Sequence, residues 1–387
     1  MKLVFLNHNV IDTGTFFRAF HVARHLVQRG HEVTVITTSR TARAGVQRHT
    51  RAGVAITEMP DLMRGAARSG IDPWNTLQRM RAVAPERCDL LYAFDSRPAV
   101  ILPALHMKRR RRLPMVMDWA DWWGRGGTIQ DRSSALVKAT VGRVETWFEE
   151  HFRTDADATT VISTALQQRA IGLGVPADSI LHFPMGCDIP TGLPTRAQAR
   201  ERLGVGSDKR IVLHLGVAVQ KDATLLFDAF RIAHQQDARI QLVLVGNFRT
   251  PTPADLSVSV VRTGVVSNDT LRDWLAAADA CVIPLRDTIA NRGRWPSKIN
   301  DYLASGRRIL VTGVGDAAPY VASHGAGQVT APSPAGLADG MLTLLAQSSG
   351  AAAAGEAAAL DLARGELSWR TIMDRVEPFL QHACAHD

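Results

Sequence analysis

The chain has 387 residues, which is more than one hydrophobic core usually supports, so we expect two domains. Its 46% hydrophobic and 21% charged content is that of a globular protein, and no apolar run is long enough to predict a membrane span. Four scattered cysteines without a C-x-x-C pair argue against a disulfide framework or a zinc site and suit a reducing cytoplasm. The net charge of +8 calls for an anionic partner, which could be nucleic acid, an anionic membrane leaflet or a phosphorylated substrate.

The first elements form a βαβ unit. An apolar strand at 3–6 is followed by a loop with Gly14 and then by a helix whose apolar residues, from Phe16 to Val27, recur three or four positions apart. We expect Phe16 and its neighbour Phe17 to be core residues. A second strand at 33–37 completes the unit, and the G-x-G-x-x-G fingerprint of dinucleotide sites is absent from this sequence.

Two further predicted strands end in polar residues. The strand at 90–94 precedes Asp95 and Arg97, and the strand at 114–117 precedes an Asp- and Trp-rich loop that contains Asp118, Asp121 and Trp122. Ligands gather at the carboxyl ends of strands in open α/β sheets, and indoles and carboxylates suit sugars. A loop of buried tryptophans with a capping aspartate is the alternative interpretation.

Two charged motifs need separate interpretation. The basic run 108–112 fits either an anionic membrane surface or a solvated helix end. The D-x-D at 155–157 precedes a strand at 158–164 instead of following one, so we do not interpret it as a metal site and expect no bound metal.

After a Pro- and Gly-rich linker at 190–194 the pattern starts again. The predicted elements of this second half are strands at 211–216, 240–246, 260–264 and 280–285, a helix at 268–277, and a helix in the Ala-rich stretch 351–363.

The stretch 291–306 carries the strongest functional signal. Arg292, Arg294 and Lys298 cluster around a helix that we expect to begin at Pro296 and to stop at Gly306, before a strand at 308–312. Cations beside unpaired N–H groups at a helix start form an anion site, usually for phosphate. A solvated basic loop is the equally simple alternative.

This stretch, RWPSKINDYLASGRRILVT, resembles the donor segment P-x-K-x-x-E/D-Y-L-A-x-G of group 1 (family 4) glycosyltransferases. The opening GTFFRAFHVARHLVQRGHEVTVIT and the D-x-x-D-x-W segment from Asp118 are similar to the same family. The resemblance implies an α/β fold of the GT-B type, in which two doubly wound, Rossmann-like parallel-sheet domains face a central cleft. It implies an acceptor domain at 1–190, a nucleotide-sugar donor domain at 191–370, and a last helix at about 371–387 that packs back onto the first domain.

The resemblance also implies the reaction, which is transfer of a sugar from a nucleoside-diphosphate sugar to a hydroxyl acceptor with retention, without a metal or other cofactor. The site residues expected from it fall into four groups. The catalytic residues are Asp121, Lys221 and Lys298; the diphosphate ligands are Gly14, Lys221, Arg292, Arg294 and Lys298; the nucleoside ligands are Gly246, Asn247, Val265 and Asp301; and the acceptor ligands are Asp95, Arg97, Asp118 and Trp122.

Two positions depart from the family pattern. Val217 stands where the family has an arginine, and Gly293 stands where it has the glutamate that contacts the sugar. These departures leave the sugar, the base and the activity itself open. A nucleotide-sugar 2-epimerase and a non-catalytic anion- or nucleotide-binding protein remain as alternatives, whereas no nucleic-acid module is recognised. We expect a cytoplasmic enzyme of glycan, glycolipid or secondary-metabolite synthesis, with a possible lipid-linked acceptor and peripheral contact with the inner face of the membrane.

Overall fold

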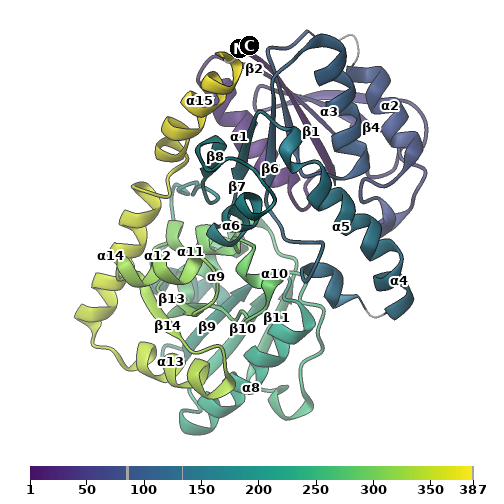
Figure 1. Ribbon diagram of the computed structural model, residues 1–387. Coiled ribbons are helices and arrows are strands. Elements are labelled where there is room, and N and C mark those ends of the chain that lie inside the picture. Colours follow the sequence, from purple (N-terminus) through teal and green to yellow (C-terminus); the bar gives the residue numbers. More distant parts are fainter. Residues whose placement is uncertain (84–86, 133, 386–387) are drawn as a thin grey trace. The chain divides into compact units, whose positions relative to one another are not determined.

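The computed structural model describes residues 1–83, 87–132 and 134–385, and the chain divides into two compact units (Figure 1). Unit 1 holds Met1–Pro184 and the C-terminal segment from Arg370, and unit 2 holds Met185–Trp369. The boundaries expected from the sequence, after 190 and after 370, lie slightly further along the chain.

Unit 1 is built on a sheet that, over the described residues, has eight strands in the order β3-β4-β2-β1-β5-β6-β7-β8. Among the strands of the described residues, only the edge strand β3 is antiparallel to its neighbour. The strands are β1 (Lys2–Val10), β2 (Glu32–Thr38), β3 (Gln47–Arg51), β4 (Val54–Met59), β5 (Leu90–Phe94), β6 (Met115–Trp119), β7 (Ala158–Val161) and β8 (Ile180–His182). Because β1 leads to β2 on one side and β5 leads to β6 on the other, the winding direction reverses between β1 and β5.

Helices cover both faces of this sheet. They are α1 (Phe16–Gln28), α2 (Pro73–Val83), α3 (Pro98–Arg111), α4 (Ala135–Ala139), α5 (Val141–His151), α6 (Thr164–Gly172) and α15 (Trp369–Ala385), with short 3-10 turns η1 (Gly65–Ala67), η2 (Thr128–Asp131), η3 (Arg153–Asp155) and η4 (Ala177–Ser179). Alternate strand residues serve opposite faces. Val4, Leu6 and Met117 join the core under α3, whereas Asp118 points to the other face and meets Arg18 of α1.

Unit 2 has a fully parallel sheet in the order β11-β10-β9-β12-β13-β14 over its described residues. The strands are β9 (Arg210–Leu215), β10 (Ile240–Val245), β11 (Val260–Gly264), β12 (Ala280–Ile283), β13 (Ile309–Thr312) and β14 (Gly327–Thr330). The helices are α7 (Arg196–Leu203), α8 (Gln220–Gln236), α9 (Asn268–Ala277), α10 (Ile289–Arg292), α11 (Lys298–Ala304), α12 (Ala317–Ser323), α13 (Pro334–Ala346) and α14 (Ser349–Arg364), with one 3-10 turn, η5 (Ala254–Leu256). The winding direction reverses between β9 and β12, and α8 and α13 pack together over one face of the sheet.

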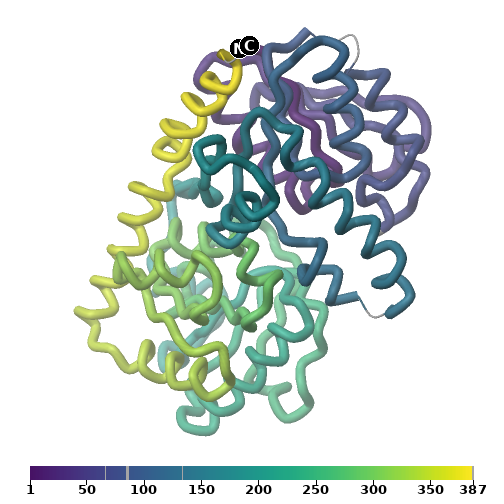
Figure 2. Tube along the Cα trace, in the orientation of Figure 1, coloured from purple at the N-terminus to yellow at the C-terminus, as the bar shows by residue number. Residues whose placement is uncertain are grey.

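The last helix returns to unit 1. Glu377 of α15 accepts hydrogen bonds from Arg29 and His31, and Arg375 donates to the carbonyl of His182. Near the end of α15, Cys384 lies beside Met1, so this part of α15 and the start of the chain are neighbours (Figure 2). Residues 386 and 387, which the predicted last helix included, lie outside the described residues.

Three sequence-based expectations differ from the structure. Strand β6 continues through Asp118 and Trp119, so these side chains belong to the sheet and not to the loop after it. Helix α11 begins at Lys298, because Pro296 and Ser297 form a turn whose carbonyls accept the N–H groups of Ile299 and Asn300. Phe17 is 43% exposed, since it lies on the outer side of α1 next to the buried Phe16.

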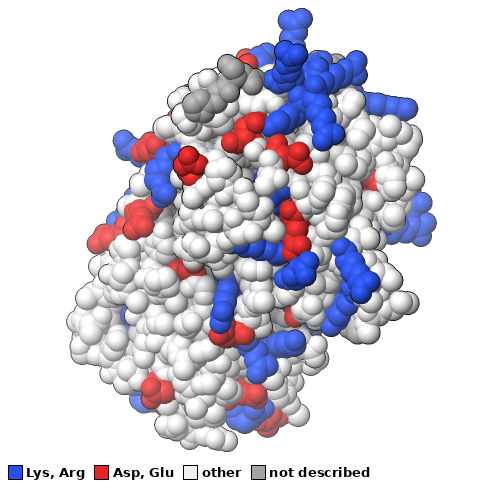
Figure 3. Space-filling model, viewed as in Figure 1, with Lys and Arg blue, Asp and Glu red and all other residues white. Residues whose placement is uncertain are grey.

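The hydropathy of the helices and the distribution of surface charge bear on contact with a membrane. Among the described residues no helix is both long enough and apolar enough to cross a bilayer. Lys and Arg side chains gather at the end of unit 1 drawn at the top of Figure 3, and α3 carries the basic run 108–111 in its last turn. Salt bridges elsewhere pair many of the other cations with acidic side chains, as for Arg231 with Asp255 and Arg239 with Asp237.

Candidate active site

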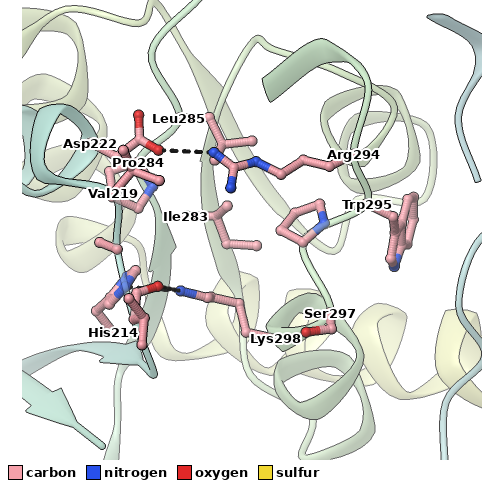
Figure 4. A pocket seen from close by; sticks show the side chains of 13 residues that line it. His214, Val219, Asp222, Ile283, Pro284, Leu285, Arg294, Trp295, Ser297 and Lys298 are labelled. Carbon is pink, nitrogen blue, oxygen red and sulfur yellow. Dashed lines mark hydrogen bonds and ion pairs between the residues drawn. The ribbon is translucent and has the colours of Figure 1, made fainter. Parts of the chain in front are cut away.

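A pocket of about 210 Å³ lies in unit 2 beyond the carboxyl ends of β9 and β12. These are the neighbouring strands at which the winding reverses, and ligands of open α/β sheets bind at such switch points. Its lining residues are His214, Val217, Ala218, Val219, Asp222, Ile283, Pro284, Leu285, Arg294, Trp295, Pro296, Ser297 and Lys298. Figure 4 shows Arg294 and Lys298 extending across the pocket from the segment before α11 toward the β9–α8 connection, with Ile283 between them.

Lys298 is held from the opposite wall. Its ammonium lies 2.9 Å from Nε2 of His214 and donates to the carbonyl of Val217 at 3.2 Å. Nδ1 of His214 lies 3.1 Å from the carbonyl of Val282, which can only accept, so Nδ1 carries the proton. Nε2 is therefore the unprotonated nitrogen, and Lys298 donates to it.

The surroundings make both groups easier to deprotonate. Removal from water, and then the nearby charge of Arg294, lower the pKa of Lys298 to about 7 against the opposing effects of Asp222 and Asp301. Burial, and then the charge of Lys298, holds the pKa of His214 well below its usual value. The pocket thus holds a lysine whose charge depends on the neighbouring carboxylates and on any anion that enters.

Arg294 is tied to a buried carboxylate. Its guanidinium lies 3.3 Å from Asp222, which is 5% exposed, and it also contacts the side-chain oxygen of Asn291. Asp222 accepts from the amide of Asn291 at 3.1 Å and from the backbone N–H of Arg286 at 2.9 Å. One carboxylate of α8 therefore fixes the loop that carries Arg294.

The N-terminus of α8 opens into the same pocket. This 17-residue helix has Val219 as its N-cap residue, and the apolar side chain of Val219 cannot accept a hydrogen bond from the first N–H groups. Ala218 and Val219 line the pocket, so the positive end of the helix lies beside Arg294 and Lys298. Two cations next to an uncapped helix start make a binding site for an anion such as phosphate.

Buried anchors hold the segment that bears the cations. The indole N–H of Trp295 donates to Asn300 at 2.8 Å, and the amide of Asn300 donates to the carbonyl of Met185 at 2.7 Å. The hydroxyl of Tyr302 accepts the N–H of Leu215 at 2.8 Å, which ties α11 to the end of β9. These contacts reduce the conformational freedom that Lys298 would otherwise lose on binding an anion.

The other predicted diphosphate ligands of unit 2 lie outside this pocket. Arg292 is 58% exposed and forms a two-point ion pair with Asp287. Lys221 is exposed in the first turn of α8 and is not among the lining residues. Of the four cations predicted in this half, the structure brings Arg294 and Lys298 together.

The predicted nucleoside ligands follow neighbouring strands. Gly246 ends β10 with φ +98°, and a Cβ there would approach Cα of Gly216 to 3.2 Å, so the close contact of the two strand ends requires glycine. Asn247 is exposed beside it, and Val265, after β11, is 83% exposed. None of these three residues lines the pocket that contains Lys298.

Asp301 lies one turn after Lys298 on α11 and lines a separate hollow of about 140 Å³ together with Asp188. Removal from water, and then the charge of Asp188, raise the pKa of Asp301 to about 6 against the opposing effect of Lys298. Asp301 and Lys298 therefore influence each other's charge although they line different hollows.

In unit 1 three of the predicted acceptor ligands form buried contacts with other side chains. Asp118 is 1% exposed and binds Arg18 and Thr160, and burial raises its pKa against the effect of Arg18. Asp95 accepts from the indole of Trp123 at 2.7 Å, and Arg97 lies over the same ring, 3.8 Å from its centroid. These buried contacts give Asp95 and Arg97 a structural role in holding Trp123 of the loop after β6, and they give Asp118 one in joining β6 to α1 and β7.

The remaining predicted residues of unit 1 are more accessible. Asp121 and Trp122 are half-buried, and the Trp122 indole donates to the carbonyl of Arg125 at 2.8 Å. Gly14 is exposed after β1 with φ +51°, and a Cβ at that position would meet the Asn9 side chain at 2.6 Å.

The sequence reasoning missed two pocket residues, His214 and Asp222. His214 lies within the apolar run read as strand β9, and Asp222 follows Lys221 in the amphipathic pattern of α8. Each is a polar residue near the end of a strand or the start of a helix at the switch point. That position is the one signal by which they could have been found.

Comparisons with known proteins agree with this architecture. The family described as "Glycosyl transferase 4-like domain" matches residues 13–186, and that described as "Glycosyl transferases group 1" matches residues 209–347. Comparison with curated protein sequences returns no significant match.

Solved structures resemble the chain over its whole length. Sucrose-phosphate synthase from Thermosynechococcus elongatus matches with a TM-score of 0.77 at 15% identity and covers 100% of both chains. HepE of Anabaena in complex with UDP-glucose matches with a TM-score of 0.70 at 18% identity, over 99% of this chain and 100% of the other. WaaG, a glycosyltransferase of lipopolysaccharide biosynthesis, matches with a TM-score of 0.69 at 16% identity, over 99% of this chain and 98% of the other. Together, the two matching domains and the two Rossmann-like units show that the chain is an enzyme of the group 1 glycosyltransferases with the GT-B fold.

Proposed function

We propose that this glycosyltransferase moves a sugar from a nucleoside-diphosphate donor to a hydroxyl group of its acceptor, with retention at the anomeric carbon. The observation that carries the proposal is the convergence of Arg294, Lys298 and the uncapped N-terminus of α8 on one pocket. A diphosphate is the anion that uses all three at once, because it presents several oxygens along a short chain.

The same groups account for catalysis. When the bond between the sugar and the diphosphate breaks, the leaving oxygen keeps the bonding electrons and negative charge grows on the diphosphate. Cations and N–H groups already held in place stabilise this charge more than that of the intact donor, and they lower the barrier. Lys298 and Arg294 are anchored before the donor binds, so little reorganisation is needed at that moment.

Arg294 takes the place of a cation that the family pattern supplies elsewhere. Val217 stands where the family has an arginine, and both Val217 and Arg294 line the pocket. We propose that Arg294 leaves Asp222 in part to bind the diphosphate and that the two cations neutralise it without a divalent ion. The approaching phosphate also favours the charged form of Lys298, because an anion raises the pKa of a neighbouring amine.

The donor and acceptor follow from the same proposal. HepE of Anabaena has been solved with UDP and with UDP-glucose, so UDP-sugars are the first donors to test. The nucleoside would lie beyond the ends of β10 and β11, near Gly246 and Val265, and Asp301 would accept from its ribose. The acceptor is a hydroxyl compound of glycan, glycolipid or secondary-metabolite synthesis bound by unit 1 near Asp121 and Trp122, at the cytoplasmic face of a membrane.

The test measures release of nucleoside diphosphate from a panel of nucleotide sugars, with and without candidate acceptors. Lys298→Ala should lower kcat/KM by about 2–4 kcal/mol of transition-state stabilisation, whereas Lys209→Ala, at an exposed lysine of the same unit, should leave it unchanged. Thermal stabilisation by none of the donors would contradict the proposal. Conversion of the donor sugar without release of the diphosphate would indicate an epimerase instead.

A further inference from the structure

Helix α5 of unit 1 buries acidic side chains and exposes apolar ones, which is the reverse of an ordinary amphipathic helix. Its buried side carries Glu145 and Glu149, which are 4% and 0% exposed, together with Gly142. Acidic residues almost never occupy buried positions unless they are paired. The arrangement therefore requires specific partners inside unit 1, and these partners are present.

The two glutamates lock the orientation of the helix. Glu145 accepts from Arg97 and, at 2.7 Å, from Arg132. Glu149 accepts the backbone N–H groups of Trp123 at 2.8 Å and Gly124 at 2.9 Å. Rotation of α5 about its axis would leave these carboxylates and their partners buried without hydrogen bonds, at a cost of about 1–3 kcal/mol or more for each group.

Because the inner side is fixed, apolar residues are forced outward. We call the residues Leu136, Val141, Val144 and Trp147 the outer face of α4–α5, and their exposed fractions are 73%, 38%, 56% and 48%. Val141, Val144 and Trp147 recur three positions apart and so share one side of α5. Contiguous exposed apolar side chains of this size mark an interaction surface.

Cations border the outer face. Lys138 of α4 and Arg143 of α5 line a hollow of about 480 Å³ that also includes Trp147 and the ion pair of Arg125 with Glu150. In Figure 3 the surface over α5 is largely uncharged, with Lys and Arg side chains at its lower edge. An apolar strip with an indole and a cationic border is the pattern of a segment that lies in the interface of an anionic membrane.

We propose that the outer face of α4–α5 docks unit 1 onto an anionic lipid bilayer, with the apolar side chains inserted at the headgroup level and Lys138 and Arg143 against lipid phosphates. The inference rests on the proposed membrane contact but is independent of the transfer reaction. It moves that contact from the basic run 108–112, whose cations have no such apolar strip among them, to a surface that combines both properties.

The alternative occupants fit less well. A second copy that paired face to face would bring Lys138 and Arg143 against the same cations of its partner, and like charges at an interface cost affinity. The face also cannot turn inward, because the ion pairs of Glu145 and Glu149 hold α5 in this orientation.

The experiment is flotation of the full chain with vesicles of phosphatidylcholine alone and of phosphatidylcholine mixed with an equal amount of phosphatidylglycerol, without donor or acceptor. We expect binding to the mixed vesicles that weakens as salt is raised. The double variant Leu136→Ser/Val144→Ser should bind at least about tenfold less, because two side chains lose their insertion. Lys138→Glu/Arg143→Glu should bind about twentyfold less or weaker still.

Matched controls separate the surface from general charge and hydropathy. Val258→Ser, at a valine that is 95% exposed, and Lys209→Glu, at a lysine that is 42% exposed, should bind like the unaltered protein. Loss of binding in Arg109→Glu/Arg110→Glu with full binding in both α4–α5 variants would assign the contact to the basic run and overturn the proposal. The proposal would also be overturned if the protein did not bind mixed vesicles or bound both kinds equally. It would be overturned as well if light scattering showed a dimer that Leu136→Ser/Val144→Ser dissociates. Transfer activity is not used as a readout, so the failure of either proposal leaves the other intact.

Discussion

The Lys298 ammonium donates a hydrogen bond to Nε2 of His214 across 2.9 Å, between two side chains that can each carry a proton. The imidazole is kept neutral because it is buried and because the charge of Lys298 lies beside it; these effects lower its pKa, whereas the hydrogen bond from Nδ1 to the carbonyl of Val282 opposes the shift. Only Lys298 therefore bears charge in this pair. His214 acts as a positioning residue, since it directs the ammonium without itself facing a phosphate as a cation.

Replacement of His214 by Gln or by Asn distinguishes the contribution of its Nε2 from that of its Nδ1. Gln can place its carbonyl oxygen near the position of Nε2 and still accept from Lys298, whereas Asn reaches only the position of Nδ1. We expect His214→Asn to lower kcat/KM about tenfold or more, because a hydrogen bond to a charged group is lost, and His214→Gln to retain most of it. Steady-state kinetics with varied donor measure the difference, and equal losses in the two variants would point to the ring contact with Phe248 instead.

Lys298 also makes stability depend on pH. Its pKa is about 7 in the folded chain against the ordinary 10.5, so between these values the unfolded chain binds a proton that the folded chain lacks. Stability from this residue therefore rises with pH across that window and is lowest below it. The unfolding midpoint in urea of wild type, relative to that of Lys298→Met, should rise between about pH 7 and about pH 10. Lys209→Met controls for the removal of one positive charge, and a flat difference would contradict the lowered pKa.

The sequence predicted much of the fold because its strands are apolar and its turns carry glycine. Strand β3 was missed for a physical reason: all five of its residues are exposed, so it shows no alternation and depends on pairing with β4. Helix α5 could not be oriented correctly either, because its apolar residues, such as Val144, face outward and its glutamates face inward.

The candidate site was predicted only where a local motif carried it. Arg294 and Lys298 stand in one recognisable segment, whereas His214 and Asp222 come from β9 and α8 and reach the pocket through the register of the sheet. Spacing along the chain does not encode that register. For the same reason Asp118 was expected in the loop after the strand, although β6 continues through it.

The ion pair of Asp118 with Arg18 offers a direct test of its role. Asp118→Asn removes one charge of a pair in which both side chains are at most 2% exposed, and the remaining buried cation should lower the free energy of unfolding by about 3–5 kcal/mol. Chemical denaturation of unit 1 measures this effect. The double variant Arg18→Met/Asp118→Asn should recover part of the loss, since it leaves no unpaired charge. Unchanged stability with a raised KM for the acceptor would support the predicted role of Asp118 as an acceptor ligand.

Asp222 is the resting counter-ion of Arg294 and competes with the diphosphate for it. Asp222→Asn keeps the shape of the side chain and an acceptor for the N–H of Arg286, but it removes the negative charge from the pocket. We therefore expect nucleoside diphosphate to bind about fivefold more tightly, which corresponds to about 1 kcal/mol for one partly screened charge. Titration calorimetry at low and high salt measures the gain, which should shrink as salt is raised.

The matched control is Asp287→Asn, which removes the same charge from the loop between β12 and α10. Asp287 pairs with Arg292 at the surface, outside the pocket, so its replacement should change the affinity little. An equal gain in both variants would mean that the affinity for the diphosphate depends only on the net charge of unit 2. A loss of affinity in Asp222→Asn would mean that the carboxylate positions Arg294 for the ligand, because the loss of its hold on the loop would then outweigh the gain in positive potential.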